Sequence, residues 1–120
     1  MKNLDTIGRF VFAIPFGVFG LMHITIAGDM AGLVPSFIPG GVFWVYVTGI
    51  ALLAATVSLV IKKHIYLSGL LLAALLIIFV LTIHLPSVIG GNMMSMSSLL
   101  KDTSLAGGAL LLAHMYREDA

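Results

Sequence analysis

Four ionisable residues stand within stretches of the sequence that are otherwise apolar: His23, His84 and the adjacent pair Lys101 and Asp102. An aspartate or lysine at the centre of a bilayer costs about 2.5–3.5 kcal/mol on insertion scales, so such residues usually belong to a site or to a buried polar network. Imidazole changes its charge near neutral pH, and a carboxylate can orient it. These residue types therefore predict either a site that handles protons or a polar contact that holds helices together.

The composition indicates that these residues lie in a membrane protein. Hydrophobic residues make up 60% of the 120-residue chain and charged residues 9%, and the mean hydropathy is +1.15. These values lie far from soluble-domain usage, and the apolar runs can span a bilayer of about 30 Å. The runs do not alternate as barrel strands do, so they predict helices. We predict an all-α integral membrane protein.

The predicted architecture is one antiparallel four-transmembrane-helix bundle that occupies residues 1–120. Its spans are expected at about 7–27, 41–61, 65–85 and 98–116, with two long outer connections, 28–40 and 86–97. Five of the six Lys and Arg residues fall on one side, namely Lys2, Arg9, Lys62, Lys63 and Arg117. By the positive-inside rule, the N- and C-termini are predicted to be cytoplasmic.

With this topology, the four ionisable residues all lie in the outer leaflet. Asp102 is expected to point inward, with His23 and His84 as its partners. It shares its helix face with small residues that favour close helix packing, namely Ala106, Ala109 and Ala113. Adjacent helical residues point about 100° apart, so we do not expect Lys101 and Asp102 to face each other. Lys101 is expected to reach the outer headgroups or to cap the same cavity.

Two interpretations of this cluster remain open. One is a hydrogen-bonded lock between spans, and the other is a pocket for a quinone or another small molecule in which His and Asp transfer protons. Catalytic residues are not assigned, and the pattern does not decide whether the protein is an enzyme. The candidates for a ligand site or polar network are His23, His84, Lys101, Asp102, Trp44 and Asn92.

Metal and haem sites were weighed against this pocket. The outer connection 86–97 carries Met93, Met94 and Met96, whose thioethers suit Cu(I), although methionine is also an ordinary space-filler. His23 and His84 lie at similar depth and could ligate a haem between them. We expect neither copper nor haem to be bound. The sequence has no cysteine, so any thiol chemistry would belong to another protein. No basic stripe predicts nucleic-acid binding.

Three segments resemble the DoxX family of small four-helix membrane proteins, also described as DoxX/DoxD-like. They are LLKDTSLAGGALLLA (99–113), GRFVFAIPFGVFGLMH (8–23) and WVYVTG (44–49). The recurring positions of the family pattern are matched by Arg9, Gly20, His23, Lys101, Asp102, Gly107 and Gly108. The resemblance transfers no individual role to these residues.

The resemblance implies a bacterial, multi-pass protein of the inner (cytoplasmic) membrane. Better-known members of the family are membrane subunits of oxidoreductase complexes, including thiosulfate:quinone oxidoreduction. The implied partners are the lipid bilayer and a membrane or redox protein, with a homo-oligomer as an open alternative. The competing hypothesis is a non-catalytic assembly, chaperone or interaction protein.

Overall fold

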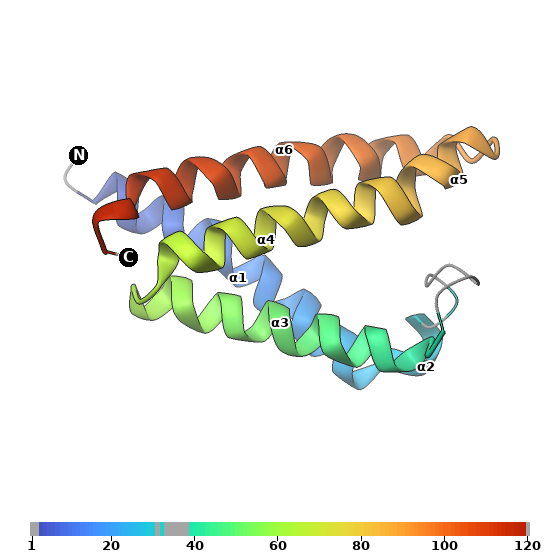
Figure 1. The fold of residues 1–120 in the computed structure, drawn as a ribbon, viewed down its shortest axis with the longest axis horizontal. Helices are drawn as coiled ribbons and strands as arrows, with labels where there is room; N and C mark the ends of the chain where they lie inside the picture. Colours follow the sequence, from blue (N-terminus) through green and yellow to red (C-terminus); the bar gives the residue numbers. More distant parts are fainter. Residues whose placement is uncertain (1–2, 31, 33–38, 120) are drawn as a thin grey trace. The chain divides into compact units, whose positions relative to one another are not determined.

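The computed structural model describes residues 3–30, 32 and 39–119, and every regular element in this part is a helix (Figure 1). The chain divides into two compact units, Met1–Ile65 and Tyr66–Ala120. Each unit is built around one pair of antiparallel helices. The all-helical fold class is therefore confirmed.

The first unit is a hairpin of α1 (Leu4–Thr25) and α3 (Val42–Ile61), with the short α2 (Ala27–Met30) after α1. The two long helices approach most closely at Gly20 and Gly49. A Cβ atom on Gly20 would lie 3.1 Å from the carbonyl oxygen of Gly49, and one on Gly49 would lie 2.8 Å from Cβ of His23. Only glycine allows this approach, and such contacts are typical of helix pairs in lipid.

The second unit is a longer hairpin. Its first arm comprises α4 (Ile65–Phe79), the π-helical turn η2 (Val80–His84) and α5 (Leu85–Ile89), and its second arm is α6 (Met94–Met115), which η3 (Arg117–Asp119) follows. The close approach here lies at Gly69. A Cβ atom on Gly69 would lie 2.9 Å from the carbonyl oxygen of Ala109 and 2.8 Å from Cβ of Ala113.

A proline accounts for the π-helical turn. Pro86 has no N–H to donate to the carbonyl of Thr82, and in a regular α-helix its ring would collide with that carbonyl. The backbone widens instead, and the N–H of Leu85 donates to the carbonyl of Val80, five residues back. Helix thus continues past Pro86, and His84 is the last residue of the widened turn.

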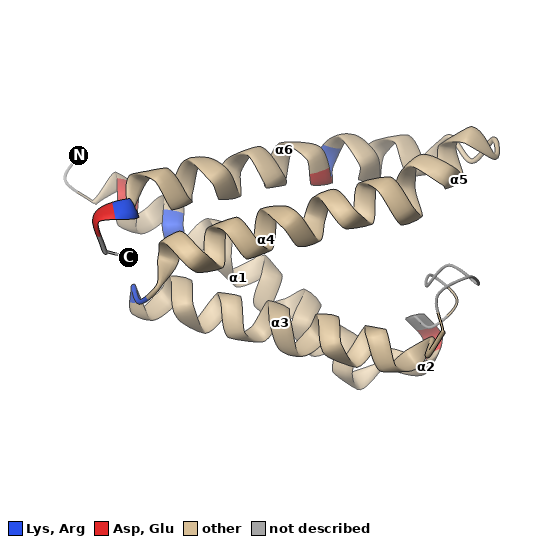
Figure 2. Cartoon of the chain, viewed as in Figure 1, with Lys and Arg blue, Asp and Glu red and all other residues tan. Residues whose placement is uncertain are grey.

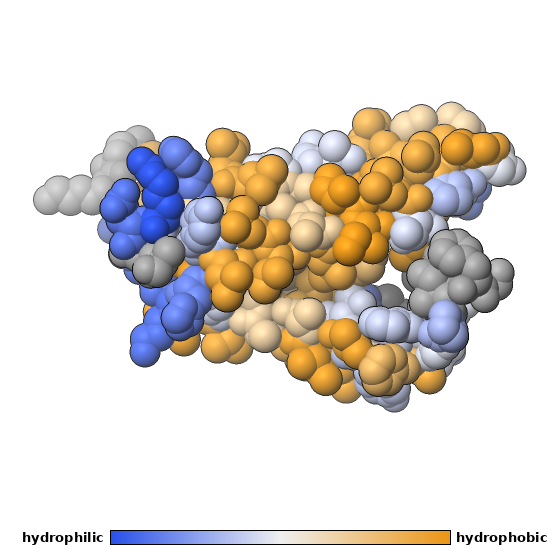
Figure 3. All heavy atoms as spheres, viewed as in Figure 1, coloured by the Kyte–Doolittle hydropathy of each residue, from blue (hydrophilic) through white to orange (hydrophobic). Residues whose placement is uncertain are grey.

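Three helices in the described part are long and apolar enough to cross a membrane: Leu4–Thr25, Val42–Ile61 and Ile65–Ile89. Their exposed surfaces carry large apolar side chains, as lipid contact requires, and Figure 3 shows such residues over both units. The fourth long helix, α6, has the same length as α1 but is less apolar, because its first half contains four serines, a threonine and the Lys101–Asp102 pair.

The helices differ in extent from the predicted spans. The predicted connection 86–97 is mostly helical, because α5 ends at Ile89 and α6 begins at Met94. The π turn lets the first arm continue beyond Pro86, which the sequence analysis took as its end. Of the predicted connection 28–40, residues 28–30 belong to α2, while residues 31 and 33–38 lie outside the described residues.

Candidate functional site

Two charged residues are buried in the described part of the chain, one in each unit. Asp102 is 8% exposed and Arg9 is 7% exposed. Figure 2 shows Asp102 and Lys101 within α6, away from both ends of that helix. As the small-residue face of α6 predicts, Asp102 is buried on the same face as three alanines, Ala106, Ala109 and Ala113.

The carboxylate of Asp102 meets the imidazole of His84. Nε2–H of His84 donates to Oδ2 of Asp102 at 2.8 Å, and the two side chains are 18% and 11% exposed. The other ring nitrogen, Nδ1, makes no hydrogen bond to any residue that the structure describes. The carboxylate thus fixes the ring and its tautomer, which leaves Nδ1 as the nitrogen that can accept or deliver a proton.

Lys101 also lies beside Asp102, contrary to the prediction that the two would not face each other. Its Nζ is 3.8 Å from Oδ1 of Asp102, and the lysine side chain is 54% exposed. The prediction was wrong because it considered only the directions in which adjacent Cβ atoms point. The four-carbon stem of lysine is long enough to bring its ammonium group back along the helix.

Two serines extend the polar contact toward the end of the hairpin. Oγ of Ser87, in α5, lies 2.6 Å from Oγ of Ser95, in α6, and both residues are partly buried. Thr82, in the π turn, donates from Oγ1 to the carbonyl of Ile78 at 2.7 Å. The sequence analysis did not single out these hydroxyls. The signal that could have found them is the fold of the hairpin itself, which places Ser87 opposite Ser95.

The other predicted site residues make local contacts. His23 lies in the first unit, where Nδ1–H donates to the carbonyl of Phe19 at 2.6 Å. Trp44 donates from Nε1 to the carbonyl of Pro39 at 2.6 Å. Asn92 accepts the backbone N–H of Met94 at 3.1 Å and so caps the start of α6. The site roles of His23, Trp44 and Asn92 stay predictions.

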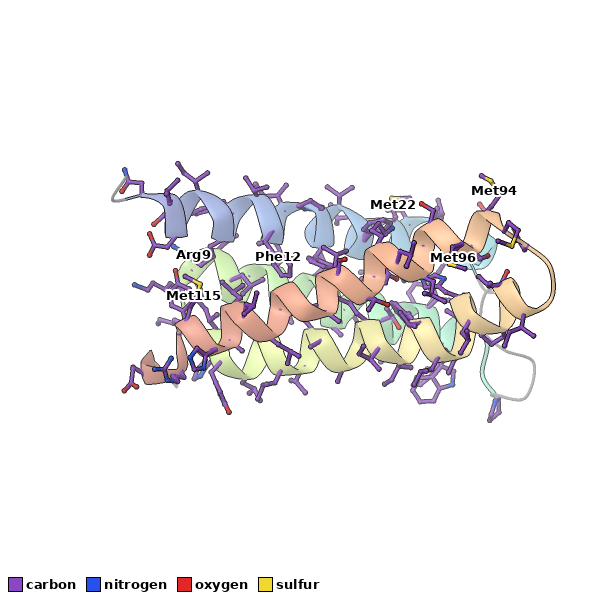
Figure 4. The ribbon with its side chains drawn as sticks, turned by 90° about the horizontal axis from the view of Figure 1, so that it is seen from above. Arg9, Phe12, Met22, Met94, Met96 and Met115 are labelled. Carbon is purple, nitrogen blue, oxygen red and sulfur yellow. The ribbon has the colours of Figure 1, made fainter. Side chains whose placement is uncertain are left out.

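The methionines proposed for copper lie at the beginning of α6 rather than in a long loop. Met93 precedes the helix and is 65% exposed, and Met94 is 83% exposed. Figure 4 shows the side chain of Met94 pointing away from α6, and Met96 follows two residues further along the helix. Within the described residues, no group of three His, Asp or Glu side chains gathers into a metal site. Metal binding stays untested.

Arg9 forms a polar centre of the first unit. The sequence predicted for it only a place among the charges of the cytoplasmic side and a match to the family pattern. Its Nη1 donates to the carbonyls of Leu59 at 2.5 Å and Val60 at 3.0 Å, in the last turn of α3. Figure 4 shows Arg9 near the N-terminal end of α1. The last carbonyls of a helix have no partner within it, so Arg9 supplies donors that α3 lacks.

Comparison with protein-family models, with curated proteins and with solved structures finds no match to this chain. Within the described residues, His84 is the histidine whose ring a buried carboxylate orients through one of its nitrogens.

Proposed function

We propose that this chain is a DoxX-like, four-span protein of the bacterial inner membrane and the membrane subunit of an oxidoreductase system. In this proposal, His84 and Asp102 transfer protons to and from a quinone or a similar small molecule. The hydrogen bond between His84 Nε2 and Asp102 Oδ2 carries the proposal. The DoxX resemblance rests on three short segments and adds the class of partner.

The length of α6 and the pairing of its buried carboxylate support it as the fourth span. Its 22 residues rise about 33 Å, enough to cross the hydrocarbon core. Asp102 has a partner on the other arm of its own hairpin, which lowers the cost of placing it in lipid. A reporter fused after Ala120 is expected to be active only in the cytoplasm, and one inserted between Gly90 and Gly91 only outside. The reverse pattern would contradict the proposed orientation.

Proton transfer to a quinone requires a side chain that can carry a proton within the apolar part of the membrane. A protonated His84 beside an ionised Asp102 is a neutral pair overall, so the pair can hold one proton with little net charge in the membrane. Nδ1–H of the protonated ring can donate to a quinone carbonyl and release its proton as that oxygen is reduced. Reduction to the quinol takes two electrons, which the redox protein partner supplies, and two protons. His84 delivers one proton to the oxygen that it contacts, the other oxygen takes its proton from the aqueous side, and the ring is reprotonated from that side.

Quinone binding tests this function directly. Ubiquinone-1 is titrated into purified protein and followed by native mass spectrometry, for the wild type, His84→Gln and Asp102→Asn. We expect at least a tenfold loss of affinity in His84→Gln, because that variant has no ring nitrogen to offer the carbonyl, and a smaller loss in Asp102→Asn. His114→Gln is the matched control, because His114 is an exposed histidine on α6. Equal binding by all four proteins would overturn the pocket.

The second candidate is a non-catalytic assembly protein, and one observation favours it. Gly107, in α6, is exposed, and no side chain or distant backbone atom would lie within 4 Å of a Cβ placed on it. An open glycine allows a partner helix to approach closely in lipid. Co-purification of a stoichiometric membrane protein, lost in Gly107→Leu and accompanied by no quinone, would favour this candidate over the first.

A further inference from the structure

We propose that the turn after α3, formed by Lys62, Lys63 and His64, binds the phosphate of an anionic phospholipid headgroup. This inference depends on membrane embedding but on neither the quinone pocket nor the orientation of the chain. The first observation is a left-handed backbone conformation at two residues that are not glycine.

Two residues of this turn have positive φ although neither is glycine. Lys62 has φ 59° and ψ 47°, and His64 has φ 58°. This left-handed region is unfavourable for residues with a Cβ atom, and glycine adopts it without that penalty. A turn that needed only to reverse the chain would be more stable with glycines. The presence of lysine and histidine therefore indicates that their side chains serve a purpose here.

The turn is also a defined structure. The N–H groups of Lys62 and Lys63 both donate to the carbonyl of Ser58, and the hydroxyl of Ser58 donates to the carbonyl of Lys63. These bonds close the last turn of α3. The two lysines are exposed, as is His64, so a fixed backbone presents their side chains to the surroundings. Figure 2 shows the lysines at the connection between α3 and α4.

The local field favours an anion. The carbonyl end of a helix carries about half a negative charge, which by itself would repel phosphate. Arg9 donates to two carbonyls of this end, those of Leu59 and Val60, and so places a full positive charge against them. Asp5, in the first turn of α1, is a carboxylate at the same end, so the described charges there are three cations, Arg9, Lys62 and Lys63, and one anion. This end of the first hairpin is therefore net cationic. Ile61, immediately before the turn, is 55% exposed and apolar.

A cation cluster beside an exposed apolar residue fits the boundary between phosphates and acyl chains. A free phosphate ion would contact the lysines alone and make no use of the apolar surface of Ile61. A phospholipid satisfies both, and each lysine near an anionic surface contributes about a fivefold increase in affinity. The chemistry therefore favours an anionic lipid over a free anion as the ligand.

The test uses the full chain in phosphatidylcholine nanodiscs with and without phosphatidylglycerol, with bound lipid counted by native mass spectrometry. We expect Lys63→Gln to lower the affinity for phosphatidylglycerol about fivefold and Lys62→Gln with Lys63→Gln about 25-fold. Arg117→Gln, the matched loss of one exposed positive charge outside the turn, should leave it within about twofold, because the guanidinium of Arg117 already has Glu118 as a partner, with Nε 3.7 Å from Oε1. Unchanged binding in the double variant overturns the proposal. So does competition by inorganic phosphate at the same phosphate concentration, since it would identify a free-anion site.

A second double variant tests whether the left-handed conformation of Lys62 and His64 is unfavourable for these residues. Lys62→Gly with His64→Gly should raise the melting temperature in zwitterionic detergent, because glycine suits the left-handed conformation, and should lower the affinity for phosphatidylglycerol. These two effects have opposite signs. A lower melting temperature in the absence of anionic lipid would show that the side chains stabilise the turn by themselves, and this result would overturn the proposal.

Discussion

Among the residues that the structure describes, each hairpin buries one charged side chain, and the two hairpins satisfy that charge differently. In the first, Arg9 donates to backbone carbonyls of α3. In the second, Asp102 accepts a hydrogen bond from another side chain, that of His84. Substitution cannot remove a backbone carbonyl, but it can remove a carboxylate and an imidazole together. The first arrangement therefore serves the end of a helix, whereas the second could be replaced by apolar residues without leaving a polar group unsatisfied.

This difference bears on function. A buried polar pair that an apolar pair could replace contributes little to the stability of the fold. The proposed contact of the His84 imidazole with a ligand would give this pair a role that an apolar pair cannot fill. Arg9 needs no ligand, because its guanidinium supplies donors to C-terminal carbonyls of α3 that have no partner within the helix.

The largest effect is expected from Arg9→Met. It removes two charge-assisted hydrogen bonds and leaves the carbonyls of Leu59 and Val60 without them, so it should lower the free energy of unfolding by about 3 kcal/mol. Arg9→Lys keeps the charge but not the planar fork of donors, so it should recover about half of this loss. Unfolding in mixed micelles provides the measurement. Equal stability of Arg9→Met and the wild type would contradict the comparison between the hairpins.

At the two helix crossings we expect a smaller loss of stability than in Arg9→Met, and a loss of similar size at both. Gly49→Ala places a Cβ 2.8 Å from Cβ of His23, and Gly69→Ala places one 2.8 Å from Cβ of Ala113. Each should cost about 1–3 kcal/mol, because the helices must separate. Gly107→Ala is the control, since it meets no neighbour and should gain up to about 1 kcal/mol from helix propensity. A loss confined to one crossing would show that only one hairpin depends on close packing.

The third prediction concerns the polar pair of the second hairpin. His84→Leu and Asp102→Leu should each cost about 1 kcal/mol, in line with hydrogen bonds measured in membrane proteins. The double variant should return close to wild-type stability, because nothing polar is left unsatisfied. Recovery of stability with loss of quinone binding indicates the pocket, whereas recovery of both indicates a structural lock. Additive losses in the double variant would show that the two residues are not coupled.

Periodicity predicted the part of this site that depends on helix faces. The alanines of α6 share a face with Asp102, and this face is buried, so the inward position of Asp102 followed from the sequence. His84 was one of two predicted partners. The choice between His84 and His23 required the hairpin pairing, which single-helix periodicity does not contain. His84 lies on the other arm of the hairpin that contains Asp102.

What the sequence analysis missed has two physical causes. Pro86 was taken as a helix end, although a π turn can accommodate a proline by shifting the hydrogen bond of Leu85 to Val80. Arg9 was used only as an orienting charge, although its side chain is buried and donates to carbonyls of α3. A long side chain can reach a distant carbonyl, and its partner is not visible from its own helix. Both errors concern which donor a backbone carbonyl accepts from, and the residue types in a sequence do not reveal these pairings.

The smallest effect is expected where the second hairpin turns. Met94→Leu with Met96→Leu should change the free energy of unfolding by no more than about 0.5 kcal/mol, because Met94 is exposed and leucine is equally apolar. Purified protein is expected to show no Soret band and no stoichiometric copper, as elemental analysis and absorbance can check. Copper at one atom per chain, lost in the double variant, would contradict this expectation. The thioethers at the start of α6 would then be the ligands, and the second hairpin would carry its chemistry in the turn rather than at His84 and Asp102.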